Sequence, residues 1–148
     1  GLAVAAYNKL GFPLKIAGTG SGYRRLHKAA GPSIEFLGWL KDEEILELYR
    51  GCRFLVFPGE EDFGIVPLEA QACGRPVVAY ARGGALETVE DGVSGMVFDE
   101  QTPESLLAAV ERCAAAQWDA QTVRANAERF DTGHFVRGLA ASIRQCLA

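Results

Sequence analysis

Four carboxylates stand close together in the segment FPGEEDFGIVPLEAQACGRP, which covers residues 57–76. Glu60, Glu61 and Asp62 are consecutive, and Glu69 follows within a stretch that otherwise contains almost only apolar residues. Carboxylate oxygens accept hydrogen bonds, so these side chains suit a ligand that carries hydroxyl groups. The spacing raises the question of whether the acids bind one ligand or belong to a charged surface.

The residues between the acids predict the start of a helix. Gly64 permits a sharp turn and Pro67 fits the first helical turn, so we expect a helix from about Ile65 to Gly74. Free backbone N–H groups at a helix start favour a phosphate. Here they belong to Phe63, Gly64, Ile65 and Val66. Amides for a phosphate and carboxylates for hydroxyls together predict a site for a phosphorylated polyol, such as a sugar with a phosphate attached.

Glu69 and Gln71 are the only polar side chains inside this expected helix. A helix that is apolar nearly all round is normally buried, so we expect Glu69 to be a buried carboxylate that needs partners. Helical side chains lean toward the N-terminus of their helix, which directs Glu69 toward the loop that holds Glu61. The sequence therefore predicts that Glu61 and Glu69 share one ligand.

The same acids also fit an interpretation without a ligand. Residues 60–62 would then be a solvated charge run, and Glu69 would pair with an arginine such as Arg53 or Arg82. Composition and spacing leave both interpretations open. The two histidines offer no competing chemistry, since His27 and His134 fall on expected helices far from this segment and are expected at the surface or in packing.

Short apolar runs alternate with helical stretches along the chain. We expect strands at residues 13–18, 33–40, 53–58, 76–80 and 94–98. We expect helices at residues 2–10, 22–30, 43–51, 65–74 and 85–92, with Asp42 as the N-cap of the third, and helical structure from about residue 102 to the end. This alternation indicates βαβ units, and we predict one α/β domain over residues 1–148 with a Rossmann-like doubly wound parallel sheet and a helical C-terminal segment.

In such sheets, ligands bind at the carboxyl ends of the strands. One expected strand ends in the loop Gly18, Thr19 and Gly20, whose backbone can approach an anion closely. A tight turn before a helix explains this loop equally well. A dinucleotide fingerprint fits poorly, because the pattern G-x-G-x-x-G needs glycine where Tyr23 stands.

Composition excludes several classes of protein. The formal charge of −4 and the pI near 5.2 argue against a nucleic-acid partner, because no basic stripe is present. The four cysteines are widely spaced without a C-x-x-C pair, so we expect reduced thiols and a cytoplasmic protein without a zinc site. No run is apolar enough to span a membrane. Gly1 leads directly into a helical stretch, and we therefore expect the chain to be part of something longer.

Residues 57–98 resemble the donor-binding half of retaining GT-B glycosyltransferases of the group 1 (GT4) family. That family is marked by two glutamates separated by seven residues, then by E-A-x-A-x-G-x-P-V-V-A and a Gly-Gly-x-x-Glu turn. The matching positions in this sequence are Glu61, Glu69, the run from Glu69 to Ala79, Gly83, Gly84 and Glu87. With the upstream segments PLKIAGTG and IEFLGWLKDEEILELYRGCRFLVFP, the resemblance covers about residues 1–115.

The resemblance implies roles for individual residues. Glu61 becomes the catalytic carboxylate, which binds hydroxyl groups of the donor sugar, and Glu69 binds the ribose of the nucleotide. The amides of Phe63, Gly64, Ile65 and Val66 would hold the diphosphate. Leu40 would meet the base through its backbone, with Trp39 and Asp42 close by, and Gly18, Thr19 and Gly20 would line the same cleft. The family pattern implies no metal and no cofactor apart from the nucleotide-sugar substrate, since backbone dipoles and basic groups can stabilise the leaving diphosphate.

The resemblance also implies that this chain is one half of a two-domain enzyme. The acceptor-binding N-terminal domain is absent, and so is the strand that usually supplies an Arg and a Lys to the diphosphate. The complete enzyme would transfer a hexose to an acceptor hydroxyl with retention of configuration, and the chain alone would be inactive. The segments PGEEDFGIVPLEA and GGALETV are similar to those of bacterial mannosyltransferases of polysaccharide assembly. This similarity implies GDP-mannose as the donor and a cytoplasmic enzyme with peripheral contact to the inner membrane.

Two other functions are compatible with the same fold. A nucleotide-sugar epimerase would also need carboxylates beside a diphosphate site. A non-catalytic nucleotide-binding domain would keep the fold without activity, although the presence of both Glu61 and Glu69 argues against a decayed site.

Overall fold

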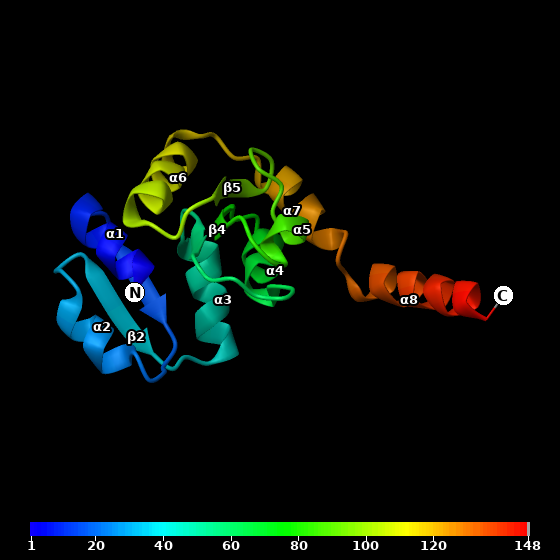
Figure 1. Cartoon of the computed structure of the whole chain (residues 1–148), viewed down its shortest axis with the longest axis horizontal. Coiled ribbons are helices and arrows are strands. Elements are labelled where there is room, and N and C mark those ends of the chain that lie inside the picture. Colours follow the sequence, from blue (N-terminus) through cyan, green and yellow to red (C-terminus); the bar gives the residue numbers. More distant parts are fainter. Residues whose placement is uncertain (148) are drawn as a thin grey trace.

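The computed structural model describes residues 1–147, in which strands alternate with helices up to β5 and helices follow to the end (Figure 1). The elements are α1 (Leu2–Leu10), β1 (Leu14–Ala17), α2 (Tyr23–Ala29), β2 (Ile34–Gly38), α3 (Asp42–Gly51), β3 (Leu55–Phe57), α4 (Ile65–Ala72), β4 (Val77–Tyr80), α5 (Ala85–Thr88), β5 (Gly95–Phe98), α6 (Pro103–Ala115), α7 (Ala120–Glu128) and α8 (Thr132–Cys146). The α/β class and the order predicted from the sequence are confirmed.

All strand pairs in the described residues are parallel, as predicted, but the strands form two sheets. One sheet has the order β1-β2 and the other the order β3-β4-β5. The central strand β4 pairs with β3 through Leu55 and Val77, and with β5 through Val77 and Gly95. Residues 77–79 are fully buried, which is the expected result for a parallel strand covered on both faces.

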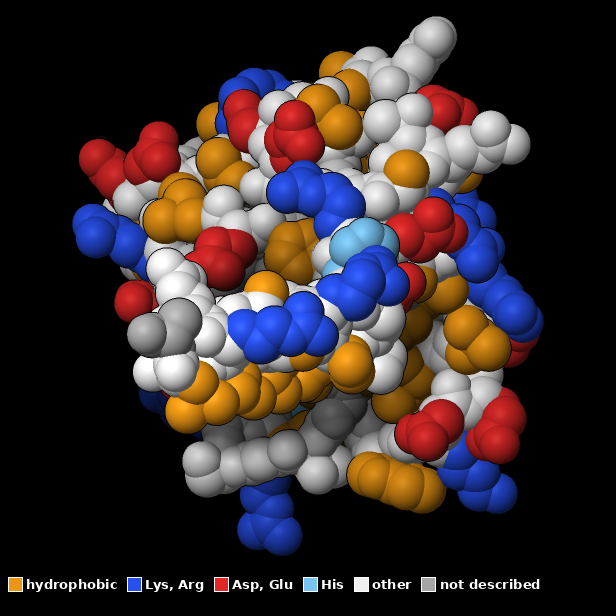
Figure 2. Space-filling view, turned by 90° about the vertical axis from the view of Figure 1, so that its right-hand side faces the viewer, with side chains coloured by type: hydrophobic (Ala, Val, Ile, Leu, Met, Phe, Trp, Pro, Cys, Tyr) orange, Lys and Arg blue, Asp and Glu red, His pale blue; other side chains and the backbone are white. Residues whose placement is uncertain are grey.

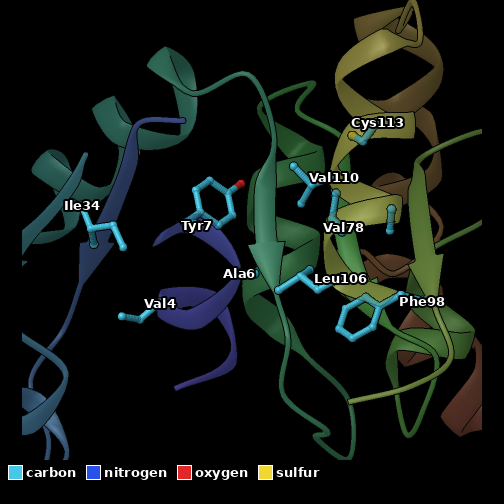
Figure 3. Packing of buried hydrophobic residues seen from close by; sticks show 10 residues of the cluster. Val4, Ala6, Tyr7, Ile34, Val78, Phe98, Leu106, Val110 and Cys113 are labelled. Atoms are coloured by element: carbon cyan, nitrogen blue, oxygen red, sulfur yellow. The ribbon is translucent and has the colours of Figure 1, made fainter. Parts of the chain in front are cut away.

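One hydrophobic cluster packs α1 and α6 together and reaches both sheets (Figure 3). Buried apolar side chains of α1 and β2 meet those of β4, β5 and α6 there. Leu106 on α6 is fully buried in this cluster. Its members are Val4, Ala6, Tyr7, Ile34, Val78, Phe98, Leu106, Ala109, Val110 and Cys113. This shared core holds the two sheets in one packed unit, although no strand pairing joins the sheets among residues 1–147.

A second cluster lies beneath α4. Ala70 of α4 packs there with buried residues of β4, with Ala85 of α5 and with Val89. Tyr49 of α3 and Phe57 of β3 cover the edge of this cluster. The second cluster therefore fixes the helix that carries Glu69 against the ends of the strands.

Helix α8 extends away from the rest of the molecule (Figure 1). It has no buried residue, and its apolar side chains Phe135, Leu139 and Ile143 are 66%, 50% and 50% exposed. Figure 2, which views the molecule from this end, shows exposed hydrophobic side chains among charged ones. The predicted helical C-terminal segment is confirmed. Over residues 1–147, no helix combines the length and the apolar character that a membrane crossing requires.

Candidate functional site

The loop between β3 and α4 forms an open hollow at the N-terminus of α4. Its volume is about 530 Å³, and it is lined by residues 60–66, which include Glu61 and Gly64. Gly64 is the N-cap residue and has φ 80°, a left-handed conformation that favours glycine. Helix α4 then begins at Ile65, and Pro67 lies buried in its first turn. The turn and the helix start predicted from Gly64 and Pro67 are confirmed.

The residues that line the same hollow include the four whose backbone N–H groups are predicted to bind phosphate. The amides of Phe63 and Gly64 have no backbone acceptor within residues 1–147, and those of Ile65 and Val66 belong to the first helical turn, where no acceptor exists inside the helix. The positive end of the helix dipole adds to their attraction for an anion. The structure thus brings the carboxylate of Glu61 and the predicted phosphate-binding amides into one hollow.

A turn of two glycines supports this loop from behind. The N–H of Gly84 donates to the carbonyl oxygen of Glu61 at 2.8 Å. A Cβ atom on Gly84 would lie 2.3 Å from the carbonyl oxygen of Phe63, and one on Gly83 would lie 2.3 Å from that of Glu61. Backbone approaches backbone here so closely that only glycine fits.

The three consecutive acids are all exposed. Among the described residues, none of the three carboxylates takes part in an ion pair within 4.0 Å. Exposure is compatible with the surface interpretation for Glu60 and Asp62. For Glu61, it leaves both carboxylate oxygens available to hydroxyl groups of a ligand.

Glu69 is exposed, and the prediction of a buried carboxylate is wrong. Helix α4 buries only one side, through Pro67, Ala70 and Gln71, and Ile65 is 63% exposed. The carboxylate Oε2 of Glu69 accepts a hydrogen bond of 2.9 Å from the hydroxyl of Tyr49. Glu69 therefore has a partner, but that partner is a tyrosine of α3.

The pairing of Glu69 with an arginine is also not found. The guanidinium of Arg53 donates to the carbonyl oxygen of Ala114 at 3.0 Å, and Arg82 makes no ion pair with the described residues. Glu69 lies in a neighbouring hollow between α4 and α7, which shares Phe63 and Ile65 with the first. The ligand that Glu61 and Glu69 are predicted to share would therefore have to extend across both hollows.

The remaining predicted site residues lie at the ends of β1 and β2. The N–H of Gly18 donates to the carbonyl oxygen of Gly38 at 2.7 Å, which joins the loop of Gly18, Thr19 and Gly20 to the end of β2, two residues before Leu40. Trp39, beside Leu40, is 71% exposed. These residues are not part of the hollow around Glu61, and the cleft that would unite them stays a prediction.

Asp42 does not cap α3, contrary to the prediction. Lys41 is the N-cap residue, and Asp42 is the first residue of the helix. Glu44 closes the start of the helix instead, because its carboxylate accepts from the N–H of Lys41 at 2.8 Å. Asp42 remains exposed near Leu40 and is available to a ligand.

Neither histidine lines the hollow around Glu61 or the neighbouring one around Glu69. His27 stacks on Tyr23 and contacts Phe36, and His134 contacts Asp131, which confirms the packing and surface roles. Within residues 1–147, no group of three or more His, Cys, Asp and Glu side chains could hold a metal ion.

Comparison with known proteins identifies the family. The model for glycosyl transferases group 1 matches residues 3–116. The chain belongs to the group 1 glycosyltransferases. The family match agrees with the resemblance seen in the sequence, and it favours a transferase over an epimerase.

Relatives of this glycosyltransferase domain are longer proteins. The D-inositol 3-phosphate glycosyltransferase of Acidothermus cellulolyticus is 34% identical over 93% of this chain and 34% of its own length. The enzyme of the same name from Segniliparus rotundus is 40% identical over 70% of this chain and 24% of its own length. The chain thus spans about a third or less of these two relatives.

Solved structures show the same fold. HepE of Anabaena in complex with UDP-glucose has a TM-score of 0.81 and 26% identity, over 97% of this chain and 44% of its own. Sucrose-phosphate synthase of Thermosynechococcus elongatus has a TM-score of 0.82 and 25% identity, over 99% of this chain and 41% of its own. The domain is therefore part of a GT-B fold.

The sequence did not reveal a buried polar network behind the candidate site. Asn126 on α7 donates to the side chain of Gln71 at 2.6 Å, to the carbonyl oxygen of Thr88 at 2.9 Å and to the hydroxyl of Ser94 at 3.1 Å. The hydroxyl of Thr88 donates in turn to the carbonyl oxygen of Gly84 at 2.9 Å. All four polar side chains are buried. Gln71, a polar residue in an apolar helix, was the only signal of the network in the sequence.

Proposed function

We propose that this chain is the donor-binding half of an enzyme that transfers a hexose from a nucleoside diphosphate to an acceptor hydroxyl, with retention of anomeric configuration. The observation that carries the proposal is the hollow in which Glu61 lies beside the amides of residues 63–66. Amides at a helix N-terminus bind diphosphate oxygens, and a carboxylate binds sugar hydroxyls. The UDP-glucose complex of HepE supports a nucleotide sugar as the donor.

In this function, the diphosphate is the leaving group of the transfer. Negative charge builds up on its oxygen as the bond to the sugar breaks, and fixed N–H dipoles stabilise that charge without a metal ion. Glu61 holds the sugar through its hydroxyl groups, and Glu69 holds the ribose. The loops of Gly18, Thr19 and Gly20 and of Leu40 and Asp42 would bind the remainder of the nucleotide.

Two donors deserve comparison because different observations favour them. The similarity to bacterial mannosyltransferases favours GDP-mannose, and the HepE complex favours UDP-glucose. A ligand that binds only the folded state raises its stability by RT ln(1 + [L]/Kd). Thermal-shift and NMR titrations with GDP-mannose, UDP-glucose, UDP-GlcNAc and NAD therefore rank the donors. Stabilisation by NAD alone would contradict the proposal.

The activity belongs to a complete enzyme that contains this domain, and we propose that the isolated chain binds donor weakly and transfers nothing. In the complete enzyme, Glu61→Gln should lower kcat/KM for transfer strongly, and Glu60→Gln should leave it nearly unchanged. Glu60 is a matched control because it is an exposed carboxylate of the same loop. Equal kcat/KM values for Glu61→Gln and the wild type would remove Glu61 from the mechanism.

We further propose that this enzyme works in the cytoplasm and at the inner membrane surface, in the synthesis of a cell-surface polysaccharide or glycoconjugate. All four cysteines are free thiols, which supports a reducing compartment. The name of the relatives makes D-inositol 3-phosphate a further acceptor to test with the complete enzyme.

A further inference from the structure

The hydroxyl of Tyr49 forms the one side-chain hydrogen bond that Glu69 makes with the described residues. It donates to Oε2 at 2.9 Å. Tyr49 lies in the last turns of α3, and its ring packs against the hydrophobic cluster beneath α4. Because the ring is held by packing, the position of its hydroxyl is fixed relative to α4.

The direction of this hydrogen bond is unambiguous. Burial raises the pKa of Tyr49, and the hydrogen bond to Glu69 and its negative charge raise the pKa further. The hydroxyl thus keeps its proton at any pH at which enzymes work and acts as the donor. A carboxylate has two oxygens, and Oε1 of Glu69 remains free to accept from another hydroxyl group.

We propose that Tyr49 is a positioning residue that holds Oε2 of Glu69 so that Oε1 is presented to the ribose hydroxyls of the donor. The inference rests on the proposed function, which assigns the ribose to Glu69. An exposed glutamate samples many rotamers, and a ligand that binds it must restrict them. When Tyr49 restricts the side chain of Glu69 before the donor binds, binding has to overcome less of this entropic cost.

A purely structural role would have different consequences. In that role Tyr49 only joins α3 to α4, and loss of its hydroxyl would lower the stability of the fold equally with every ligand. A positioning role predicts a loss confined to ligands that carry ribose hydroxyls. Ligands with and without these hydroxyls therefore separate the two roles.

The experiment uses Tyr49→Phe, which keeps the ring in its packing and removes only the hydroxyl. We would measure Kd by calorimetry or NMR for UDP, GDP and their 2′,3′-dideoxy analogues. We expect Tyr49→Phe to weaken the preferred nucleotide about three- to tenfold, a loss of about 0.6–1.4 kcal/mol. The dideoxy analogue should bind the variant and the wild type equally. Tyr7→Phe is the matched control, because it removes a phenol hydroxyl from the core around α1.

A double-mutant cycle tests whether Tyr49 acts through Glu69. We expect Tyr49→Phe to add almost nothing to the loss caused by Glu69→Gln, since contacting residues are coupled. Additive losses would overturn the inference, and so would a Tyr49→Phe variant that loses thermal stability but binds UDP and GDP like the wild type. In the complete enzyme, the donor KM should rise in Tyr49→Phe while kcat stays nearly constant.

The outcomes also distinguish the inference from the proposed function. If Glu69→Gln binds the nucleotides as tightly as the wild type, the assignment of the ribose to Glu69 fails, and the inference fails with it. The absence of saturable binding of UDP or GDP to the wild-type chain would count against both. If Glu69→Gln binds more weakly and Tyr49→Phe does not, only the inference is wrong.

Discussion

Replacement of Gly84 by alanine should disturb the candidate site from behind, without replacing any residue that lines the hollow. The added Cβ would lie 2.3 Å from the carbonyl oxygen of Phe63 and 2.4 Å from its Cα. Ordinary contact begins near 3.4 Å, so the turn and the loop must separate by about 1.1 Å, which is 3.4 minus 2.3. Both neighbours are backbone and cannot rotate away. The 2.8 Å hydrogen bond between Gly84 and Glu61 would then be lost.

The energetic consequence follows from these distances. Overpacking costs about 1–3 kcal/mol, and loss of a hydrogen bond costs about 1 kcal/mol more. We therefore expect Gly84→Ala to lower the free energy of unfolding by roughly 2–4 kcal/mol and Tm by roughly 5–15 °C. A displacement of about 1 Å in a site can reduce activity about 100-fold, so nucleotide binding should weaken even where the variant is fully folded.

Denaturant unfolding and calorimetric titration with UDP and GDP measure the two effects. Gly51→Ala is the matched control, since a Cβ there meets nothing within 4 Å at the end of α3. The control should keep wild-type stability within about 1 kcal/mol and wild-type affinity. If Gly84→Ala matched Gly51→Ala in both measurements, the loop of Glu61 would not depend on its contact with the glycine turn.

Three further variants test other parts of the structure. Asn126→Ala should lower the free energy of unfolding by about 2–4 kcal/mol in denaturant titrations, because it leaves the buried amide oxygen of Gln71 without its donor and removes one of the two hydrogen bonds that the hydroxyl of Ser94 accepts. Leu106→Ala should cost about 2–5 kcal/mol in the same assay, since it opens a cavity in a fully buried part of α6. Burial raises the pKa of Cys113 from 9.0 to about 12, so its neutral form stabilises the fold below pH 9 and this contribution is lost as the pH rises toward 12. The free energy of unfolding, measured from pH 9 toward pH 12, should therefore fall more steeply for the wild type than for Cys113→Ala.

The sequence predicted the order of elements and the helix start at Ile65 because both depend on local signals. Apolar runs, Gly64 and Pro67 act through neighbours along the chain. The prediction that Glu69 is buried was wrong, because the composition of α4 does not say which side of the helix is covered. Ile65 is apolar yet 63% exposed, since it lies in the first turn beside the hollow.

The partners within the site depend on contacts that are distant along the chain. Tyr49 and Glu69 are 20 residues apart, and Asn126 and Gln71 are 55 residues apart. Tyr49 fits the apolar spacing of α3, which is typical of a packing residue and gives no information about the partner of its hydroxyl. No local sequence pattern predicts such pairs, because the packing of α3 and α7 on α4 brings their members together.

The buried network supports both segments that carry the candidate carboxylates, the loop of Glu61 and the helix of Glu69. The backbone of Gly84 joins Thr88 to Glu61, because its carbonyl oxygen accepts from the hydroxyl of Thr88 and its N–H donates to the carbonyl oxygen of Glu61. Gln71 lies on the same helix as Glu69 and is held by Asn126. Satisfied buried networks rigidify what they hold, so Asn126 should influence both acids at once. Asn126 lies on α7, beyond residue 116, where the family match ends, so this predicted influence would come from a helix outside the segment that identifies the family.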